Sequence, residues 1–301
     1  MHLLNKLVVA SLPAVPRPVV RHFASRYIAG DSLEQAVTCV RRLNAEEHVM
    51  ATMDVLGEDI STRAEADEAR RDAEEVLHAI ARERLDSNLS IKLTSLGLKV
   101  DKSFCQENVQ KILRVASRYG NFVRIDMEDS SCTSDTIEVF RAVHADHANC
   151  GIVLQAYLRR TEADVRALIG SRANVRLCKG IYREPDAIAF QGRAEVQQNF
   201  LHLLRVLLEH GCYVGIATHD SVLVDGASAM IREMGLDRNA YEFQMLLGVR
   251  PELRRTLVRE GHRLRLYVPF GEHWYAYSVR RFKENPEVAG YIFRALFMPN
   301  T

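Results

Sequence analysis

The stretch of residues 122–157 reads FVRIDMEDSSCTSDTIEVFRAVHADHANCGIVLQAY and holds two apolar runs with a helical segment between them. Phe122–Met127 and Ile152–Tyr157 have the short, apolar and β-branched composition of buried strands. Asp135–His147 has the period of a helix. A strand, a crossover helix and a second strand of these lengths predict a parallel βαβ unit.

The same alternation continues over the rest of the chain. The expected strands are His48–Leu56, Leu89–Leu93, Phe122–Met127, Ile152–Tyr157, Val175–Lys179, Tyr213–Thr218, Tyr241–Leu246 and Leu264–Val268. The expected helices between them are Thr62–Arg84, Gln106–Tyr119, Asp135–His147, Glu162–Ile169, Asp186–His210, Val222–Met234 and Pro251–Glu260. Eight strands separated by helices predict an α/β fold with a parallel sheet, and closing that sheet on itself gives a (βα)8 barrel of the TIM type.

An open, doubly wound sheet is the alternative arrangement of the same elements. In such a sheet the first turn from strand to helix should carry a glycine fingerprint for phosphate groups. The chain contains neither G-x-G-x-x-G nor G-x-x-x-x-G-K. The closed barrel is therefore favoured.

Residues 1–45 are expected to form an N-terminal helical segment, and residues 46–301 the barrel domain. Asp31 and Glu34 have the spacing of a capping box before a helical stripe. The first thirty residues carry four Lys and Arg and no acidic residue, a composition that also occurs in organellar transit peptides. Because three prolines interrupt this stretch, a retained bacterial-type N-terminus is favoured, with the mitochondrial matrix as the alternative location.

The overall composition narrows the class of protein further. Forty Lys and Arg stand against 39 Asp and Glu, so no strongly basic surface for nucleic acid is expected. The six cysteines form no C-x-x-C pair and no cluster with histidines at metal-ligand spacing, which indicates reduced cytosolic thiols and no metal site. No apolar run approaches the roughly 20 residues that a membrane-spanning helix needs. A cytoplasmic protein is expected.

Polar residues lie at or near the ends of most of the expected strands, where the chemistry of a barrel collects. They are Lys92, Arg124, Asp126, Gln155, Arg176, Lys179, Thr218, His219, Asp220, Gln244 and Tyr267. A charge within an apolar strand costs several kcal/mol unless it is paired, so these residues predict a connected polar cavity at the barrel mouth. A purely structural layer of salt bridges is the alternative interpretation.

The last expected helix follows the final strand and ends before Pro286. Tyr277, Arg280, Arg281 and Glu284 lie at i, i+3, i+4 and i+7, which places them on one stripe of this helix. Two guanidinium groups beside an aromatic ring are suited to binding a carboxylate in bidentate fashion. A solvated basic helix face is the alternative.

Several of these segments together resemble the proline dehydrogenase family. The resemblance rests on VRLCKGIY at 175–182, IATHD at 216–220, EFQML at 242–246 and Tyr-x-x-Arg-Arg-x-x-Glu-Asn-Pro at 277–286. It runs in order from about Val49 to Pro286. The family implies a distorted (βα)8 barrel with a final helix over its mouth and FAD bound noncovalently at the carboxyl ends of the strands.

The resemblance implies roles for individual residues. In the substrate site, Arg280 and Arg281 would clamp the proline carboxylate, and Glu284 would hold the two guanidinium groups. The other implied substrate residues are Lys92 near the carboxylate and amine, and Tyr267 and Tyr277 against the proline ring. The implied flavin residues are Asp126, Met127, Gln155, Arg176, Lys179, Gly180, Ile181, Thr218 and His219. Among them, Arg176 is expected beside the reactive ring nitrogen, steadied by Asp126, and these two are the expected catalytic residues.

The implied activity is the oxidation of L-proline to Δ1-pyrroline-5-carboxylate by hydride transfer to the flavin, the first step of proline catabolism to glutamate. The family passes electrons to membrane quinones, so a peripheral membrane contact through the first thirty residues is expected. A chain that ends at Thr301 has no room for a second enzyme domain, so a monofunctional form with a separate pyrroline-5-carboxylate dehydrogenase is expected. Arg183 stands where bifunctional members carry tryptophan, which leaves the flavin packing on that side open.

Two other classes compete with this interpretation. A barrel with lysines at strand ends is also compatible with a Schiff-base aldolase, in which Lys92 or Lys179 attacks a carbonyl. A non-enzymatic binding barrel, in which the charges at the strand ends are merely structural, is the second.

Overall fold

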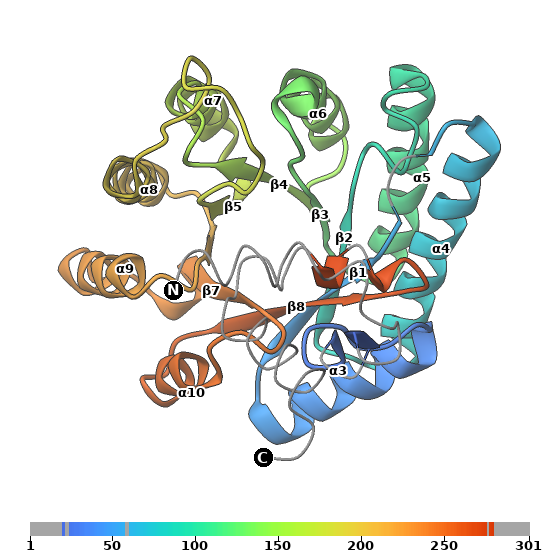
Figure 1. The fold of residues 1–301 in the computed structure, drawn as a ribbon, viewed down its shortest axis with the longest axis horizontal. Coiled ribbons are helices and arrows are strands. Elements are labelled where there is room, and N and C mark those ends of the chain that lie inside the picture. The colour runs from blue at the N-terminus through green and yellow to red at the C-terminus, as the bar shows by residue number, and fades with distance from the viewer. Residues whose placement is uncertain (1–19, 22–23, 58–59, 276, 280–301) are drawn as a thin grey trace, which may run out of the picture.

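The computed structural model describes residues 20–21, 24–57, 60–275 and 277–279, and within them eight parallel strands close into a barrel. Each strand pairs with its neighbours in the sequence, and β8 pairs with β1 to complete the cylinder (Figure 1). The strands are β1 Met50–Val55, β2 Ser87–Ile91, β3 Val123–Ile125, β4 Cys150–Gln155, β5 Asn174–Cys178, β6 Val214–Ala217, β7 Tyr241–Leu246 and β8 Leu264–Phe270. The predicted (βα)8 barrel of the TIM type is confirmed.

Helices surround the barrel on its outside (Figure 1). They are α3 Leu33–Glu47, α4 Arg63–Arg82, α5 Lys102–Arg118, α6 Ser130–His144, α7 Thr161–Leu168, α8 Arg193–Glu209, α9 Ser221–Glu233 and α10 Pro251–Arg259, with 3-10 turns η2 Ile169–Ser171 and η3 Arg238–Ala240. Side-chain caps begin several of them, such as the capping box of Thr62 and Glu65 at α4. The seven helices expected between the strands occur within about five residues of their predicted bounds, except at the start of α8.

The predicted helix Asp186–His210 is wrong in its first turns, because α8 begins at Arg193 after the N-cap Gly192. The preceding residues form a loop that docks against the end of β4. Ile188 accepts a backbone hydrogen bond from Arg159, and Phe190 donates one to Tyr157. This tertiary docking overrides the local helical pattern, because the loop satisfies its backbone groups against the segment that follows β4 instead.

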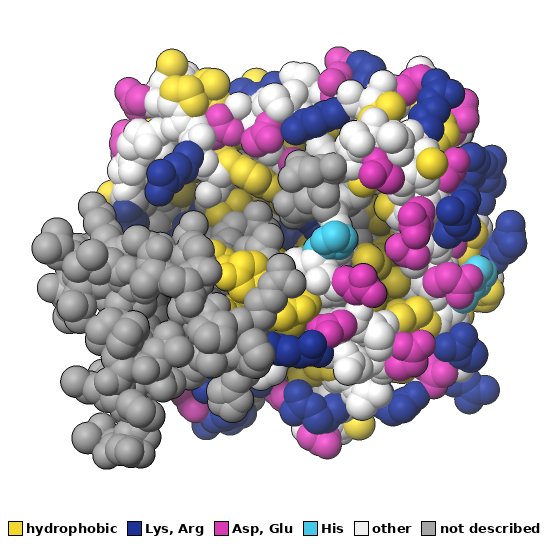
Figure 2. Space-filling model, turned by 45° about the vertical axis from the view of Figure 1, so that its right-hand side comes forward, with side chains coloured by type: hydrophobic (Ala, Val, Ile, Leu, Met, Phe, Trp, Pro, Cys, Tyr) yellow, Lys and Arg dark blue, Asp and Glu magenta, His cyan; other side chains and the backbone are white. Residues whose placement is uncertain are grey.

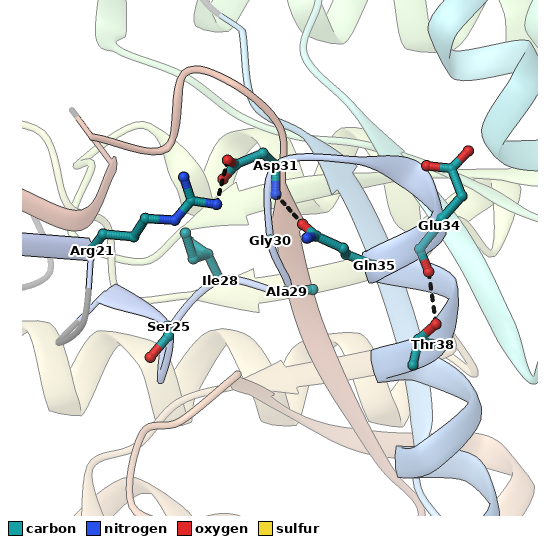
Figure 3. A pocket seen from close by; sticks show the side chains of 9 residues that line it. All are labelled: Arg21, Ser25, Ile28, Ala29, Gly30, Asp31, Glu34, Gln35 and Thr38. Carbon is teal, nitrogen blue, oxygen red and sulfur yellow. Dashed lines mark hydrogen bonds and ion pairs between the residues drawn. The ribbon is translucent and has the colours of Figure 1, made fainter. Parts of the chain in front are cut away.

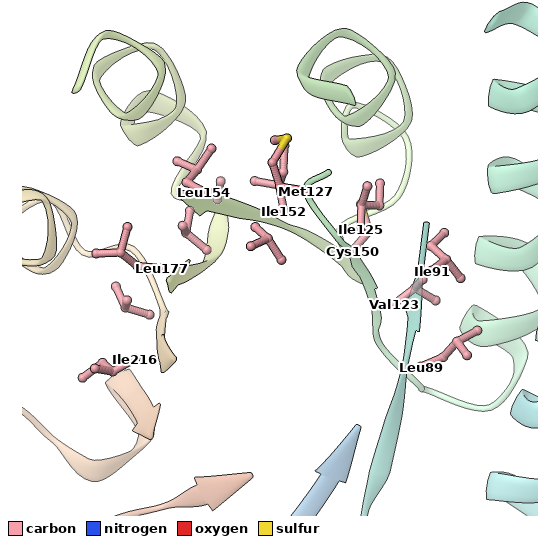
Figure 4. Packing of buried hydrophobic residues seen from close by; sticks show 14 of the residues in the cluster. Leu89, Ile91, Val123, Ile125, Met127, Cys150, Ile152, Leu154, Leu177 and Ile216 are labelled. Atoms are coloured by element: carbon pink, nitrogen blue, oxygen red, sulfur yellow. The ribbon is translucent and has the colours of Figure 1, made fainter. Parts of the chain in front are cut away.

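The main hydrophobic core lies between the strands and the helices. Figure 4 shows this layer: Leu89, Ile125, Ile152 and Leu177 project from their strands away from the barrel axis. Because side chains alternate along a strand, the intervening residues point into the barrel. Many of those are polar, such as Arg124, which is buried to 1% exposure.

The N-terminal part of the chain packs onto the barrel. Helix α3 lies against β1 and β8 within the main core, and it crosses the predicted domain boundary at residues 45 and 46. Its N-cap is Ser32, which accepts from the Gln35 backbone, so the predicted cap at Asp31 is displaced by one residue. The six cysteines are free thiols. Within the described ranges, no helix combines the length and the hydropathy needed to cross a bilayer.

Candidate active site

Asp126 and Arg176 form a buried ion pair near the carboxyl ends of β3 and β5. Arg176 Nη1 donates to Asp126 Oδ1 at 2.7 Å, and the two side chains are 8% and 12% exposed. The Ser90 hydroxyl also donates to Asp126 Oδ1, at 2.6 Å. The structure therefore brings together the two expected catalytic residues, and it adds Ser90, which the sequence analysis did not single out.

Tyr267 joins this pair from β8. Its hydroxyl donates to Asp126 Oδ2 at 2.7 Å, and its ring lies 5.2 Å from the Arg176 guanidinium carbon, within cation–π range. Burial and then the charges of Asp126 and Asp54 raise the pKa of Tyr267 well above its ordinary value. The phenol therefore remains a neutral hydrogen-bond donor at physiological pH.

Lys92 forms a second buried ion pair, with Asp54 of β1. The Nζ atom lies 2.7 Å from Asp54 Oδ1, and the side chains are 10% and 3% exposed. Burial raises the pKa of Asp54, and Asp126 adds to this, while the ammonium group of Lys92 opposes it. Asp54 was missed at the sequence level, although a carboxylate inside the apolar run Met53–Val55 gives the same signal as Asp126.

A cavity of about 660 Å³ opens beside this pair, between the ends of β1 and β2 and helix α4. Its outer wall carries Glu65, Glu68, Asp72 and Glu75 of α4. Figure 2 turns the side with α4 and α5 forward and shows acidic side chains gathered near a histidine on this face. The cavity therefore connects the buried lysine to an acidic surface.

Gln155 lies at the end of β4, and one atom of its side-chain amide has no hydrogen-bond partner among the described residues. Its Nε2 donates to the Glu128 carbonyl at 2.8 Å, whereas its buried Oε1 has no hydrogen-bond partner among the described residues. Leaving a buried acceptor unpaired costs on the order of 1–3 kcal/mol. An orphaned acceptor at the barrel mouth fits a ligand that donates a hydrogen bond there, as the edge of an isoalloxazine ring would.

The loop after β5 carries Lys179, Gly180 and Ile181. Lys179 Nζ lies 3.2 Å from Oδ2 of Asp220, whose other carboxylate oxygen caps α9. Gly180 has φ +105°, and a Cβ atom there would lie 2.0 Å from the Tyr157 ring. The backbone of this loop therefore passes the ring too closely for any side chain, while Ile181 stays 45% exposed.

Three of the predicted flavin residues have roles within the protein itself. The Thr218 hydroxyl accepts from the Asp220 backbone at 3.1 Å, and His219 Nε2 accepts from the Leu246 backbone at 2.9 Å. The Met127 side chain points to the helix side of the sheet, into the main core (Figure 4). Their contacts with a flavin stay predictions.

Tyr277 is buried in a small cluster together with Trp274 and Leu56 and with four residues of the N-terminal part, Val20, Ala24, Tyr27 and Ile28. Arg280, Arg281 and Glu284 lie outside the described residues, so the expected carboxylate clamp and the final helix over the mouth stay predictions.

A second cavity, of about 470 Å³, lies between the N-terminal part and the start of α3 (Figure 3), and Asp31 lines both cavities. Arg21 and Asp31 form an ion pair at 2.5 Å on its wall. It contains none of the polar residues from the strand ends. The barrel mouth is therefore the better candidate for the active site.

Comparisons with known proteins show the family to which this chain is similar. The family model described as "Proline dehydrogenase" matches residues 36–292. Proline dehydrogenase 1 of Bacillus subtilis (strain 168) is 37% identical over 273 residues, which are 91% of this chain and 90% of the relative. Proline dehydrogenase of Deinococcus radiodurans is 35% identical over 298 residues, or 96% of each chain.

Solved structures give the same fold. Proline utilization A of Bdellovibrio bacteriovorus, inactivated by N-propargylglycine, aligns with a TM-score of 0.82 and 26% identity. The aligned part is 93% of this chain and 34% of that chain. Proline utilization A of Corynebacterium freiburgense aligns with a TM-score of 0.77 at 23% identity, over 97% of this chain and 34% of that one. This chain therefore spans about a third of the length of these solved proteins.

Proposed function

Because the chain belongs to the proline dehydrogenase family, we propose that it oxidises L-proline to Δ1-pyrroline-5-carboxylate with noncovalently bound FAD. The observation that carries the proposal is the buried cluster of Arg176, Asp126 and Tyr267 near the carboxyl ends of the strands. The Schiff-base aldolase and the non-enzymatic barrel have no comparable support.

Several features of the mouth support FAD as the cofactor. Gln155 Oε1 is a buried acceptor without a partner among the described residues. At Gly180 the backbone of the loop packs directly against the Tyr157 ring, which fixes the course of the segment that is proposed to hold the pyrophosphate. The chemistry that bound FAD supplies is acceptance of a hydride from the ring carbon beside the proline nitrogen.

The protein's own part is to hold the reactants and to place charge. The Arg176 guanidinium, fixed by Asp126, is set to stabilise negative charge that develops at the mouth. Lys92 and Tyr267 lie at the same end of the barrel and are proposed to contact the substrate. Arg280, Arg281 and Glu284 are proposed to bind the carboxylate and so to orient the ring.

The setting of the enzyme is proposed from the family. Electrons pass to a quinone, which calls for a cytoplasmic protein that contacts the inner face of the membrane peripherally through its first thirty residues. The product, a cyclic imine, is chemically unstable as an end point, and a separate pyrroline-5-carboxylate dehydrogenase is the proposed partner that consumes it.

The visible spectrum of the purified protein tests cofactor and substrate together. A flavin spectrum is expected, and it should bleach when L-proline is added without oxygen. A colourless protein that binds no added FAD contradicts the cofactor, whereas a yellow protein that L-proline does not bleach contradicts the substrate.

The carboxylate clamp has its own test. R280M/R281M should raise the KM for L-proline by about tenfold or more, since each removes a charged hydrogen bond. The matched control is R114M/R118M, which removes two exposed arginines of α5. An unchanged KM in the first variant contradicts the clamp.

A further inference from the structure

Arg176, the proposed catalytic arginine, lies at one end of a series of buried hydrogen bonds that crosses the interior of the barrel. Arg176 Nε donates to Gln244 Oε1 of β7, and Gln244 Nε2 donates to Glu242 Oε1 at 2.6 Å. Glu242 is held in turn by Arg265 of β8, through Nε at 2.7 Å and Nη2 at 3.1 Å. Arg265 Nη1 donates to the Ala51 carbonyl of β1 at 2.7 Å, which anchors the chain to the barrel wall.

The orientation of the Gln244 amide follows from its two neighbours. A guanidinium can only donate, so the amide must present its oxygen to Arg176. An ionised carboxylate can only accept, so the amide must present its nitrogen to Glu242. Burial alone would raise the pKa of Glu242, but the charge and the hydrogen bonds of Arg265 lower it below its ordinary value, so Glu242 stays ionised. Glu242 and Arg265 therefore select one of the two amide orientations.

A glycine on the adjacent strand makes room for this contact. Gly215 of β6 pairs in register with Arg176 on one side and with Glu242 on the other. A Cβ atom at Gly215 would lie 2.4 Å from Gln244 Nε2 and 2.8 Å from its Cδ. The side chain of Gln244 therefore occupies space that any other residue at position 215 would fill.

We propose that Gln244, oriented by Glu242 and Arg265, is a positioning residue that fixes the plane of the Arg176 guanidinium at the active site. This inference rests on the proposed function, in which that guanidinium stabilises the reduced flavin. Two hydrogen bonds to different edges of a planar group, at Nε to Gln244 and at Nη1 to Asp126, determine its orientation. Within the described ranges Nη2 of Arg176 donates no hydrogen bond, so it is the atom available to a ligand.

The test replaces the amide without changing the length of the side chain. Gln244→Met should shift the two-electron midpoint potential of the bound FAD by about 30 mV to the negative, the equivalent of a tenfold weaker hold on the reduced form. The kcat for L-proline should fall by roughly tenfold, with KM changed by less than about twofold. The control is Thr52→Val, which removes another buried hydrogen bond inside the barrel, to Asn88, without touching Arg176.

Gly215→Ala is the second variant, because it leaves every polar group in place and only displaces the Gln244 amide. The same direction of shift is expected. An unchanged potential in a folded Gln244→Met or Gly215→Ala protein overturns the proposal, even if the melting temperature falls. The proposal is also overturned if both variants are insoluble while Thr52→Val is soluble. The hydrogen bonds between Arg176, Gln244, Glu242 and Arg265 would then be needed for folding.

The potential is measured without proline, so an error in the substrate does not disturb this test. If the wild-type protein binds no FAD, the proposed function is contradicted. If it binds FAD but Gln244→Met leaves the midpoint potential of the FAD unchanged, only this inference is contradicted.

Discussion

Lys92 and Asp54 illustrate how a single buried pair is balanced in this barrel. Both side chains are nearly removed from solvent, and their charged atoms are 2.7 Å apart. Taking either charge away leaves the other in a medium of low dielectric constant without compensation. The pair is therefore expected to respond very differently to single and to double substitution.

Lys92→Met should lower the free energy of unfolding by about 3 kcal/mol, because the Asp54 carboxylate then stays buried without its partner. Adding Asp54→Asn should recover most of this loss. Urea unfolding of the four proteins of the cycle gives the coupling. The exposed Lys102→Met serves as the surface control. If the two single variants lose stability additively in the double variant, the ion pair is not the cause.

His262 gives a pH dependence at the scale of one residue. Its ring is 12% exposed, lies 5.0 Å from the Phe243 ring and is 2.9 Å from the Tyr241 hydroxyl. Burial lowers its pKa below the ordinary 6.5, with the charge of Glu260 opposing this. Below pH 6.5 the unfolded chain therefore takes up a proton that the folded protein does not.

The free energy of unfolding should thus fall as the pH drops from 6.5 toward 5, and His262→Gln should remove part of that slope. Chemical unfolding at a series of pH values measures it. At pH 7.5 the His262 ring is neutral in the folded and in the unfolded protein. The difference in free energy of unfolding between wild type and His262→Gln at that pH therefore reports packing alone. Identical slopes for the two proteins would assign the pH dependence to other groups.

At the scale of elements, the loop between β5 and α8 is the segment that is proposed to hold part of the FAD. Glu184 accepts from the Ser130 backbone at 2.8 Å and from its hydroxyl at 2.7 Å, which ties this loop to the start of α6. At its beginning, Gly180 passes against the Tyr157 ring with a backbone conformation that favours glycine. The loop is therefore held near its start and in its middle by contacts with residues that are distant in the sequence.

Gly180→Ala should displace this loop and weaken FAD binding, because the added methyl group collides with the Tyr157 ring and the φ angle is strained. The flavin content after purification and the Kd for added FAD measure the loss. Gly170→Ala is the matched control, since nothing lies within 4 Å of a Cβ atom there. Equal FAD affinity in both variants would show that the loop has no part in binding.

At the scale of the whole molecule, the barrel has a hydrophobic layer outside the strands and a polar network inside them. Arg124, Arg176 and Arg265 are all buried there, and each is paired or hydrogen-bonded. Few apolar contacts stabilise such an interior, so its stability depends on hydrogen bonds and ion pairs that satisfy the buried polar groups. Ligand binding at the mouth should therefore contribute to the stability of the entire domain.

Removing FAD should lower the melting temperature, and adding it back should restore about 2.7 kcal/mol at a free concentration one hundred times the Kd. Thermal unfolding of the apoprotein with increasing FAD measures this. Riboflavin is the control, because it lacks the phosphates and adenosine that the loop after β5 is proposed to hold. A melting temperature that does not depend on FAD contradicts a binding site in the native barrel.

The amino-acid sequence by itself determined the order and identity of the strands, because hydrophobic periodicity is a local property. It also marked Asp126, Arg176 and Lys92, since a charge inside an apolar run is visible without knowing its partner. Residues 280–284 were marked by their helical spacing alone, and their placement stays a prediction.

Only the tertiary structure decided which partners these charges have. Lys92 meets Asp54 across 38 residues, and Arg176 meets Gln244 across 68. It also decided that the residues before Arg193 form a docked loop and not a helix. The physical reason is that partners inside a closed barrel are set by strand register around the cylinder, which no periodicity within one strand encodes.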